Sequence, residues 1–155
     1  MNTAASKAEA QWLIAKHGSV VNFGSPTDAV DGEWVVKAET ALSRPLSESY
    51  KWFLKTYVGG EIGGEEIYSL YGIPFESVNG GDIVFQHFAN RKAGLLDDMK
   101  LVISETDLGE VFFFDCSQFG DGEYPIYLRL ASGDAMYYAK DFYEFLCKRV
   151  VLHSS

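Results

Sequence analysis

Four apolar segments in the second half of the chain are joined in pairs by turns too short for a crossover connection. One turn lies at Asp107-Leu108-Gly109 and the other at Ser132-Gly133-Asp134. Parallel neighbours need a connection of a dozen or more residues, so each pair is expected to be antiparallel. This feature favours an α+β fold over a doubly wound α/β fold. The segments are KLVISET (100–106), GEVFFFDC (109–116), YPIYLRL (124–130) and DAMYYA (134–139).

Helical spacing of apolar residues dominates the rest of the chain. EEIYSLYGI (65–73) is interpreted as a further strand, and residues 18–32 mostly as loop because they are rich in glycine and proline. No linker or repeat divides the chain, so we expect residues 1–155 to form a single compact domain. Its twisted, mainly antiparallel sheet would carry N-terminal helices and a closing C-terminal helix packed on it. The expected helices cover residues 4–17, 33–43, 47–58, 81–93 and 141–151.

The stretch YKWFLKTYVGGEIGG combines a helical apolar face with two glycine pairs. Tyr50, Phe53, Leu54 and Tyr57 follow i, i+3, i+4 and i+7 spacing, which places them on the core side with Trp52 elsewhere. Ser47 is the expected N-cap. At the other end, Gly59 is expected to end the helix in a left-handed conformation. A phosphate-binding loop would need a strand before the glycines and a lysine after them, so the pattern predicts a turn between helix and sheet.

Composition limits the classes of protein that the chain can belong to. The 155 residues are 47% hydrophobic, enough for a sizeable core, yet no apolar run approaches the roughly 20 residues that cross a bilayer. The N-terminus lacks the features of a signal peptide, so a cytoplasmic location is expected. Cys116 and Cys147 are expected to be buried and reduced. No cysteine or histidine spacing predicts a metal site, and we expect no cofactor.

Negative charge is concentrated in the middle of the chain. The net charge is −9, and residues 56–128 alone contain thirteen acidic and three basic residues, which leaves −10 there and +1 in the flanks. Nucleic acid is a poor partner for such a surface because binding it requires basic contacts to phosphate. A basic protein partner is plausible, since complementary fields speed encounter. The alternative is an acidic surface that only aids solubility.

Three quoted segments, in this order, resemble the SUKH superfamily, the Smi/Knr-type domains. They are RPLSESYKWFLKTYVGGEIGG (44–64), GEVFFFDCSQFGDGEYPIYL (109–128) and a final Phe-x-x-Phe-Leu helix. The signature region spans roughly residues 33–150. One departure is the order Pro45-Leu46, because the family usually has leucine before proline.

The resemblance implies a compact α+β fold with helices on a twisted sheet. For bacterial members it implies an immunity protein that binds and neutralises a cognate toxin of a polymorphic toxin system, often a nuclease. For eukaryotic members the resemblance implies a regulatory protein-interaction module instead. The family offers no catalytic residues, and the residues that match its motif are expected to be architectural: Tyr50, Phe53, Leu54, Gly59, Gly60, Gly109 and Pro125.

No spacing in the sequence assembles a catalytic site. The GxSxG, HExxH and Cys-His signatures are missing. Neighbours in a strand point to opposite faces, so Glu65 and Glu66 are poor candidates for a cooperating acid and base. We therefore expect no enzymatic activity, and a small hydrolase that uses carboxylates is the less favoured alternative.

Partner binding is assigned to the acidic middle of the chain and to one aromatic residue in a loop. Most aromatic side chains there are expected in the core because each strand needs one buried face. Phe119, between Gln118 and Gly120, is the one most expected to be exposed. The candidate partner-binding residues are Glu61, Glu65, Glu66, Asp82, Asp97, Asp98, Phe119, Asp121 and Glu123.

Overall fold

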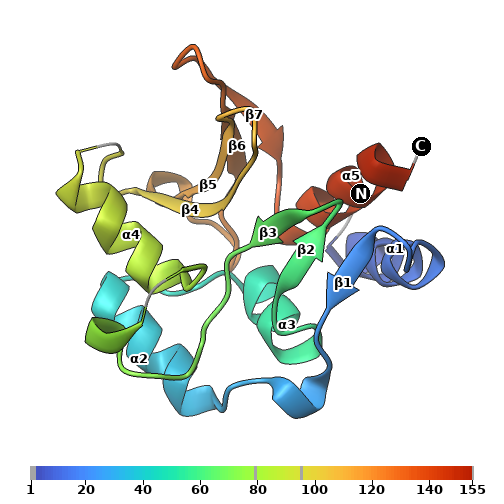
Figure 1. Cartoon of the computed structure of the whole chain (residues 1–155), viewed down its shortest axis with the longest axis horizontal. Coiled ribbons are helices and arrows are strands. Elements are labelled where there is room, and N and C mark those ends of the chain that lie inside the picture. The colour runs from blue at the N-terminus through green and yellow to red at the C-terminus, as the bar shows by residue number, and fades with distance from the viewer. Residues whose placement is uncertain (1–2, 79, 95, 155) are drawn as a thin grey trace.

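The fold combines five α-helices with two antiparallel sheets in the part of the chain that the computed structural model describes, residues 3–78, 80–94 and 96–154 (Figure 1). This confirms the α+β prediction. The helices are α1 (Thr3–Lys16), α2 (Gly32–Leu42), α3 (Glu48–Thr56), α4 (Ile83–Lys92) and α5 (Phe142–Ser154). The strands are β1 (Val21–Phe23), β2 (Gly60–Ile62), β3 (Glu65–Ile67), β4 (Lys100–Glu105), β5 (Val111–Asp115), β6 (Ile126–Arg129) and β7 (Ala135–Ala139).

The larger sheet has the order β4-β5-β6-β7, with every pair antiparallel. Both expected hairpins form, and each turn contains a glycine with positive φ, Gly109 at +80° and Gly133 at +99°. On β5, Phe112 and Phe114 point into the core. Phe112 lies 5.2 Å from Phe145 of α5, and Phe114 lies 5.7 Å from Tyr50 of α3. These contacts place α3 and α5 on one face of the sheet.

The α3 helix has the predicted core face. Ser47 accepts a hydrogen bond from the backbone N–H of Tyr50, as an N-cap does. Tyr50 and Phe53 are fully buried and Leu54 is nearly so, whereas Trp52 is only partly buried on another side of the helix. The Tyr50 hydroxyl donates to the carbonyl of Tyr68, 2.6 Å away, so the ring ties α3 to the chain that leaves β3.

The predicted left-handed cap at Gly59 is wrong. Val58 has the left-handed conformation, with φ +70°, and its N–H donates to the carbonyl of Phe53. Gly59 is needed for another reason, because a Cβ there would lie 2.7 Å from the Cβ of Ser69. The glycine therefore allows a close approach between two segments, while a β-branched residue takes the strained position.

We expect Val58→Gly to be more stable than Val58→Ala by about 1 kcal/mol, because alanine pays the left-handed penalty and glycine does not. Both variants remove the branched side chain, so their difference isolates the backbone conformation. Urea denaturation of the two variants measures it. An alanine variant at least as stable as the glycine variant would contradict the left-handed assignment.

The smaller sheet has the order β1-β2-β3 and was only partly predicted. Gly63 and Gly64, both with positive φ, form the tight turn between β2 and β3, which confirms the hairpin-like loop. The expected strand at 65–73 ends at Ile67, and β1 lies in a region that was expected to be mostly loop. The N–H of Tyr68 donates to the carbonyl of Ile103 in β4, so the smaller sheet is joined to the larger one.

Candidate partner-binding surface

Glu61 and Glu66 lie directly opposite each other on β2 and β3. Both side chains are exposed, while their neighbours Ile62 and Ile67 are buried on the other face of the hairpin. Like charges at opposed positions of an antiparallel pair are destabilising. The hairpin therefore holds two carboxylates where a cation from outside the chain would relieve their repulsion.

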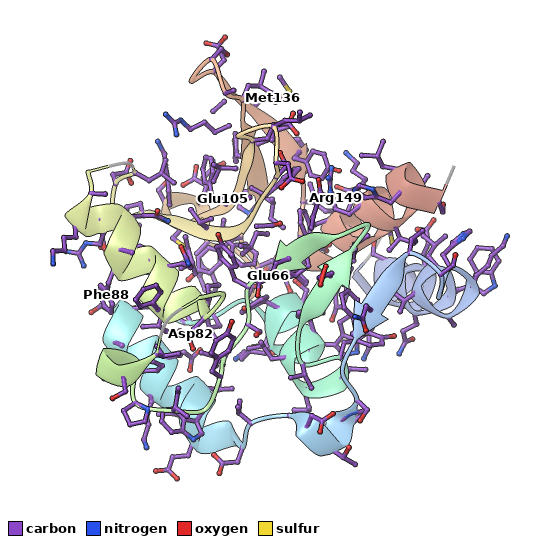
Figure 2. All side chains as sticks on the ribbon, in the orientation of Figure 1. Glu66, Asp82, Phe88, Glu105, Met136 and Arg149 are labelled. Atoms are coloured by element: carbon purple, nitrogen blue, oxygen red, sulfur yellow. The ribbon has the colours of Figure 1, made fainter. Side chains whose placement is uncertain are left out.

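Glu105, at the end of β4, adds a third carboxylate to this surface. The Ser104 hydroxyl donates to the carbonyl of Glu66, 2.7 Å away, which holds the end of β4 beside β3. Burial first, and then the charges of Glu105 and Glu66, raise the pKa of Tyr68, so both carboxylates act on one ring. Figure 2 shows Glu66 and Glu105 near each other at the centre of the molecule. Glu61, Glu66 and Glu105 are called the acidic face below.

No ion pair within 4 Å involves the acidic face among the residues that the structure describes. The Glu66 carboxylate packs closely against Gly81. A Cβ added at Gly81 would lie only 2.1 Å from Oε2 of Glu66. Tyr71, 42% exposed, borders it, and its hydroxyl accepts a hydrogen bond from the N–H of Gly81. The exposed Tyr71 ring thus lies beside Glu66, whose carboxylate contacts the Tyr71 side chain but forms no ion pair with the described residues, a combination suited to a basic partner.

Asp82 does not belong to an exposed binding surface, which corrects the expectation from sequence. Its side chain is fully buried and caps α4, accepting hydrogen bonds from the N–H groups of Val84 and Phe85. Its other oxygen accepts from the N–H of Tyr71. The carboxylate is therefore fully used in holding the start of α4 against the segment after β3.

Glu65 is also occupied by partners within the chain. It accepts from the guanidinium of Arg149 and lies 3.0 Å from Nε2 of His153, both on α5. Its side chain is 19% exposed, and the Gly63 turn lies against the His153 ring. Glu65 therefore fastens the β2–β3 turn to the last turns of α5 and is not free to meet a partner.

Asp98 lies at the centre of a cationic cluster. Its carboxylate is 2.6 Å from Nη2 of Arg44, 3.0 Å from Nε2 of His87 and 3.3 Å from Nε of Arg91. The hydrogen bond from His87 is the largest cause that lowers the pKa of Asp98. Asp97 beside it is exposed and 3.4 Å from the ammonium of Lys100. Because both acids are paired, the surface around Asp97 and Asp98 offers little uncompensated negative charge.

The buried His87 should make the protein less stable below pH 6.5. Burial is the largest cause that lowers its pKa from 6.5, with Arg44 and Arg91 acting in the same direction and Asp98 against them. The unfolded chain then binds a proton that the folded chain does not, so stability falls as the pH drops. We expect His87→Gln to flatten the loss between pH 6.5 and about 5, above the range where most carboxylates titrate.

Urea denaturation of the wild type and of His87→Gln at several pH values tests this expectation. Glutamine keeps a donor for Asp98 but does not titrate. Curves of unfolding free energy against pH that run parallel for the two proteins would show that His87 contributes nothing to the acid sensitivity.

Phe119, Asp121 and Glu123 form a second, separate group. Their loop packs on the start of α3, where the N–H of Glu48 donates to the carbonyl of Gly122. The acidic face follows the other end of that helix, and nine helical residues span about 13 Å. The structure therefore does not unite the two groups in one continuous site.

Within this loop, Glu123 has a structural role. Its carboxylate accepts from the N–H and hydroxyl of Ser49, 2.9 and 2.5 Å away, and the Ser49 hydroxyl accepts from the N–H of Phe142. Burial is the main cause that raises the pKa of Glu123. Asp121 is exposed, and Phe119 is 49% exposed with its ring 4.8 Å from Tyr124. Glu123 thus joins the loop to α3 and α5.

Two further properties bear on the chemistry of the chain. Among the residues that the structure describes, no group of three or more His, Cys, Asp or Glu side chains could hold a metal ion. Within the same residues, every helix is too short or too polar to span a membrane. Cys116 and Cys147 are both buried and free.

Comparison with known proteins places the chain in a family. No curated protein matches it. A family model does match, over residues 29–148, close to the signature region of 33–150 that was expected from the sequence. This match covers most of the 155 residues, and the chain therefore belongs to the SMI1 / KNR4 family (SUKH-1).

Proposed function

We propose that this protein is a cytoplasmic immunity protein, which binds a cognate bacterial toxin that has a basic surface and neutralises it stoichiometrically. The acidic face carries the proposal. Glu61, Glu66 and Glu105 are exposed and form no ion pair with the residues that the structure describes, whereas Glu65, Asp82, Asp98 and Glu123 are engaged by neighbours. Unpaired carboxylates that repel one another favour the approach of a complementary positive surface.

Family membership and the two free thiols agree with this role. The resemblance to bacterial SUKH domains implies immunity by binding and supplies no catalytic residues. Free cysteines are typical of proteins in a reducing compartment. Glu123 is the carboxyl group with a raised pKa, but its hydrogen bonds to Ser49 give it a structural task. The geometry therefore favours binding over hydrolysis.

The direct test begins by finding out whether the gene immediately upstream encodes a toxin domain, and uses that domain as the partner. Purified protein is titrated against the toxin while complex formation and toxic activity are measured together. We expect activity to fall in proportion to a one-to-one complex and to vanish at equivalence. Two results would contradict the proposal: no complex with unchanged toxicity, or loss of toxicity at catalytic amounts of this protein, which would indicate an enzyme.

A further inference from the structure

A recess lined by none of the acidic-face residues carries more lysines than carboxylates. Four helices contribute to it, with Lys7 from α1, Gly32 from α2, Trp52 from α3 and Tyr143 from α5. Its volume is about 570 Å³, within the range of sites that bind small molecules. Val30, Val35 and Leu54 make part of the wall apolar, and no residue of the acidic face lines it.

The Trp52 ring forms a fixed aromatic wall in this recess. Tyr143 meets it edge-on, with ring centroids 5.1 Å apart, and Tyr57 does so at 5.4 Å. Tyr143 is itself 6% exposed, so the ring that supports Trp52 is held by the core. A ring fixed in this way loses little conformational freedom when a ligand stacks on it.

The charged residues that line the recess are three lysines, Lys7, Lys51 and Lys55, and one carboxylate, Glu48. Lys51 is neutralised, since its ammonium is 3.1 Å from Glu48 and 3.9 Å from Glu39. Lys7 lies 5.9 Å from the centre of the Trp52 ring, and neither Lys7 nor Lys55 forms an ion pair with the described part of the chain. In a protein of net charge −9, two unpaired cations at one recess call for an anion from outside.

We propose that this recess binds a nucleoside monophosphate. The planar base stacks against Trp52, and the phosphate is held by the ammonium groups of Lys7 and Lys55. Stacking on an aromatic side chain tolerates any base, and lysine ammonium groups bind phosphate as point charges. The site needs no glycine-rich phosphate loop, because its charges come from helices far apart in the sequence.

The experiment follows the indole N–H resonances of the full-length protein by ¹H–¹⁵N NMR during titration with AMP, adenosine and inorganic phosphate. We expect AMP to shift the Trp52 resonance saturably and to leave Trp12 and Trp34 in place. Adenosine and phosphate should each bind more weakly than AMP, because each offers only half of the contacts. AMP that leaves Trp52 unshifted at millimolar concentration, or phosphate that binds as tightly as AMP, would overturn the proposal.

Charge substitutions supply the second arm. Lys7→Gln with Lys55→Gln should weaken AMP binding by about a hundredfold, since each substitution removes a charged hydrogen-bond donor to the phosphate. The matched control is Lys16→Gln with Lys92→Gln, which makes the same change in net charge, and Lys16 likewise lies over a tryptophan, Trp12. AMP affinity that falls equally in both double variants, or in neither, would show that the recess is not the site.

Discussion

Phe53→Ala is expected to destabilise the protein by about 3–5 kcal/mol, the usual cost of removing a fully buried phenylalanine ring. Phe53 has no exposed surface, and its ring lies 5.2 Å from Phe23 of β1 and 5.0 Å from Phe142 of α5. Tyr50 of its own helix and Tyr57, which follows the helix, complete the cluster. The substitution would therefore leave a cavity where the smaller sheet, α3 and α5 meet. A loss of this size is a large share of the stability of a small domain.

Chemical denaturation measures this loss, with Phe88→Ala as the matched control. Phe88→Ala removes the same side chain from another helix, α4. Because Phe88 is 38% exposed, its substitution should reduce the free energy of unfolding much less. Two variants of equal stability, or a cost below about 1 kcal/mol for Phe53→Ala, would show that the shared core has been wrongly located.

Turn length and helical spacing made the main elements predictable. The two hairpins of the larger sheet followed from connections too short for a crossover, and the core face of α3 followed from four apolar residues at helical spacing. The strands of the smaller sheet, β1, β2 and β3, have three residues each, too few to show alternation. The local turn at Gly63 and Gly64 pairs β2 with β3, but β1 joins them because Val21 pairs with Ile62 across a long stretch of chain, a contact that no local pattern encodes.

The end of α3 shows how a local rule can fail. Glycine is the residue most suited to a left-handed position, and two glycines follow the helix, so Gly59 was the natural choice. The helix instead ends one residue earlier, with Tyr57 as its C-cap and Val58 in the left-handed conformation, while Gly59 approaches Ser69 too closely for any side chain. The glycine is therefore required by a three-dimensional contact and not by the helix cap.

The acidic surface was predictable in composition but not in membership. Sequence gives the positions of the carboxylates, whereas the availability of each depends on distant partners. Asp98 is paired with Arg44, 54 residues away, and Glu65 with Arg149, 84 residues away. Glu105 was overlooked as a binding residue because only contacts distant in sequence, such as the hydrogen bond from Ser104 to Glu66, place the end of β4 beside β3.

Reversing the acidic face is expected to slow association with a basic toxin by about 10- to 1,000-fold at low salt, the range over which electrostatic steering acts. The triple variant is Glu61→Lys, Glu66→Lys and Glu105→Lys, and all three side chains are exposed. Dissociation should change less, because exposed charges mainly guide the encounter. The association rate of the variant should also lose the decline with added salt that the wild type shows.

The control must separate local from total charge, because the triple variant also changes the net charge by six. Asp28→Lys, Glu33→Lys and Asp134→Lys make the same change at exposed positions outside the acidic face. Association rates measured for both triple variants at low and high salt decide the question. If the control slows association as much as the acidic-face variant does, net charge alone explains the effect. If neither variant changes the rate, the toxin docks elsewhere, and the separate loop with Phe119 and Asp121 becomes the next surface to substitute.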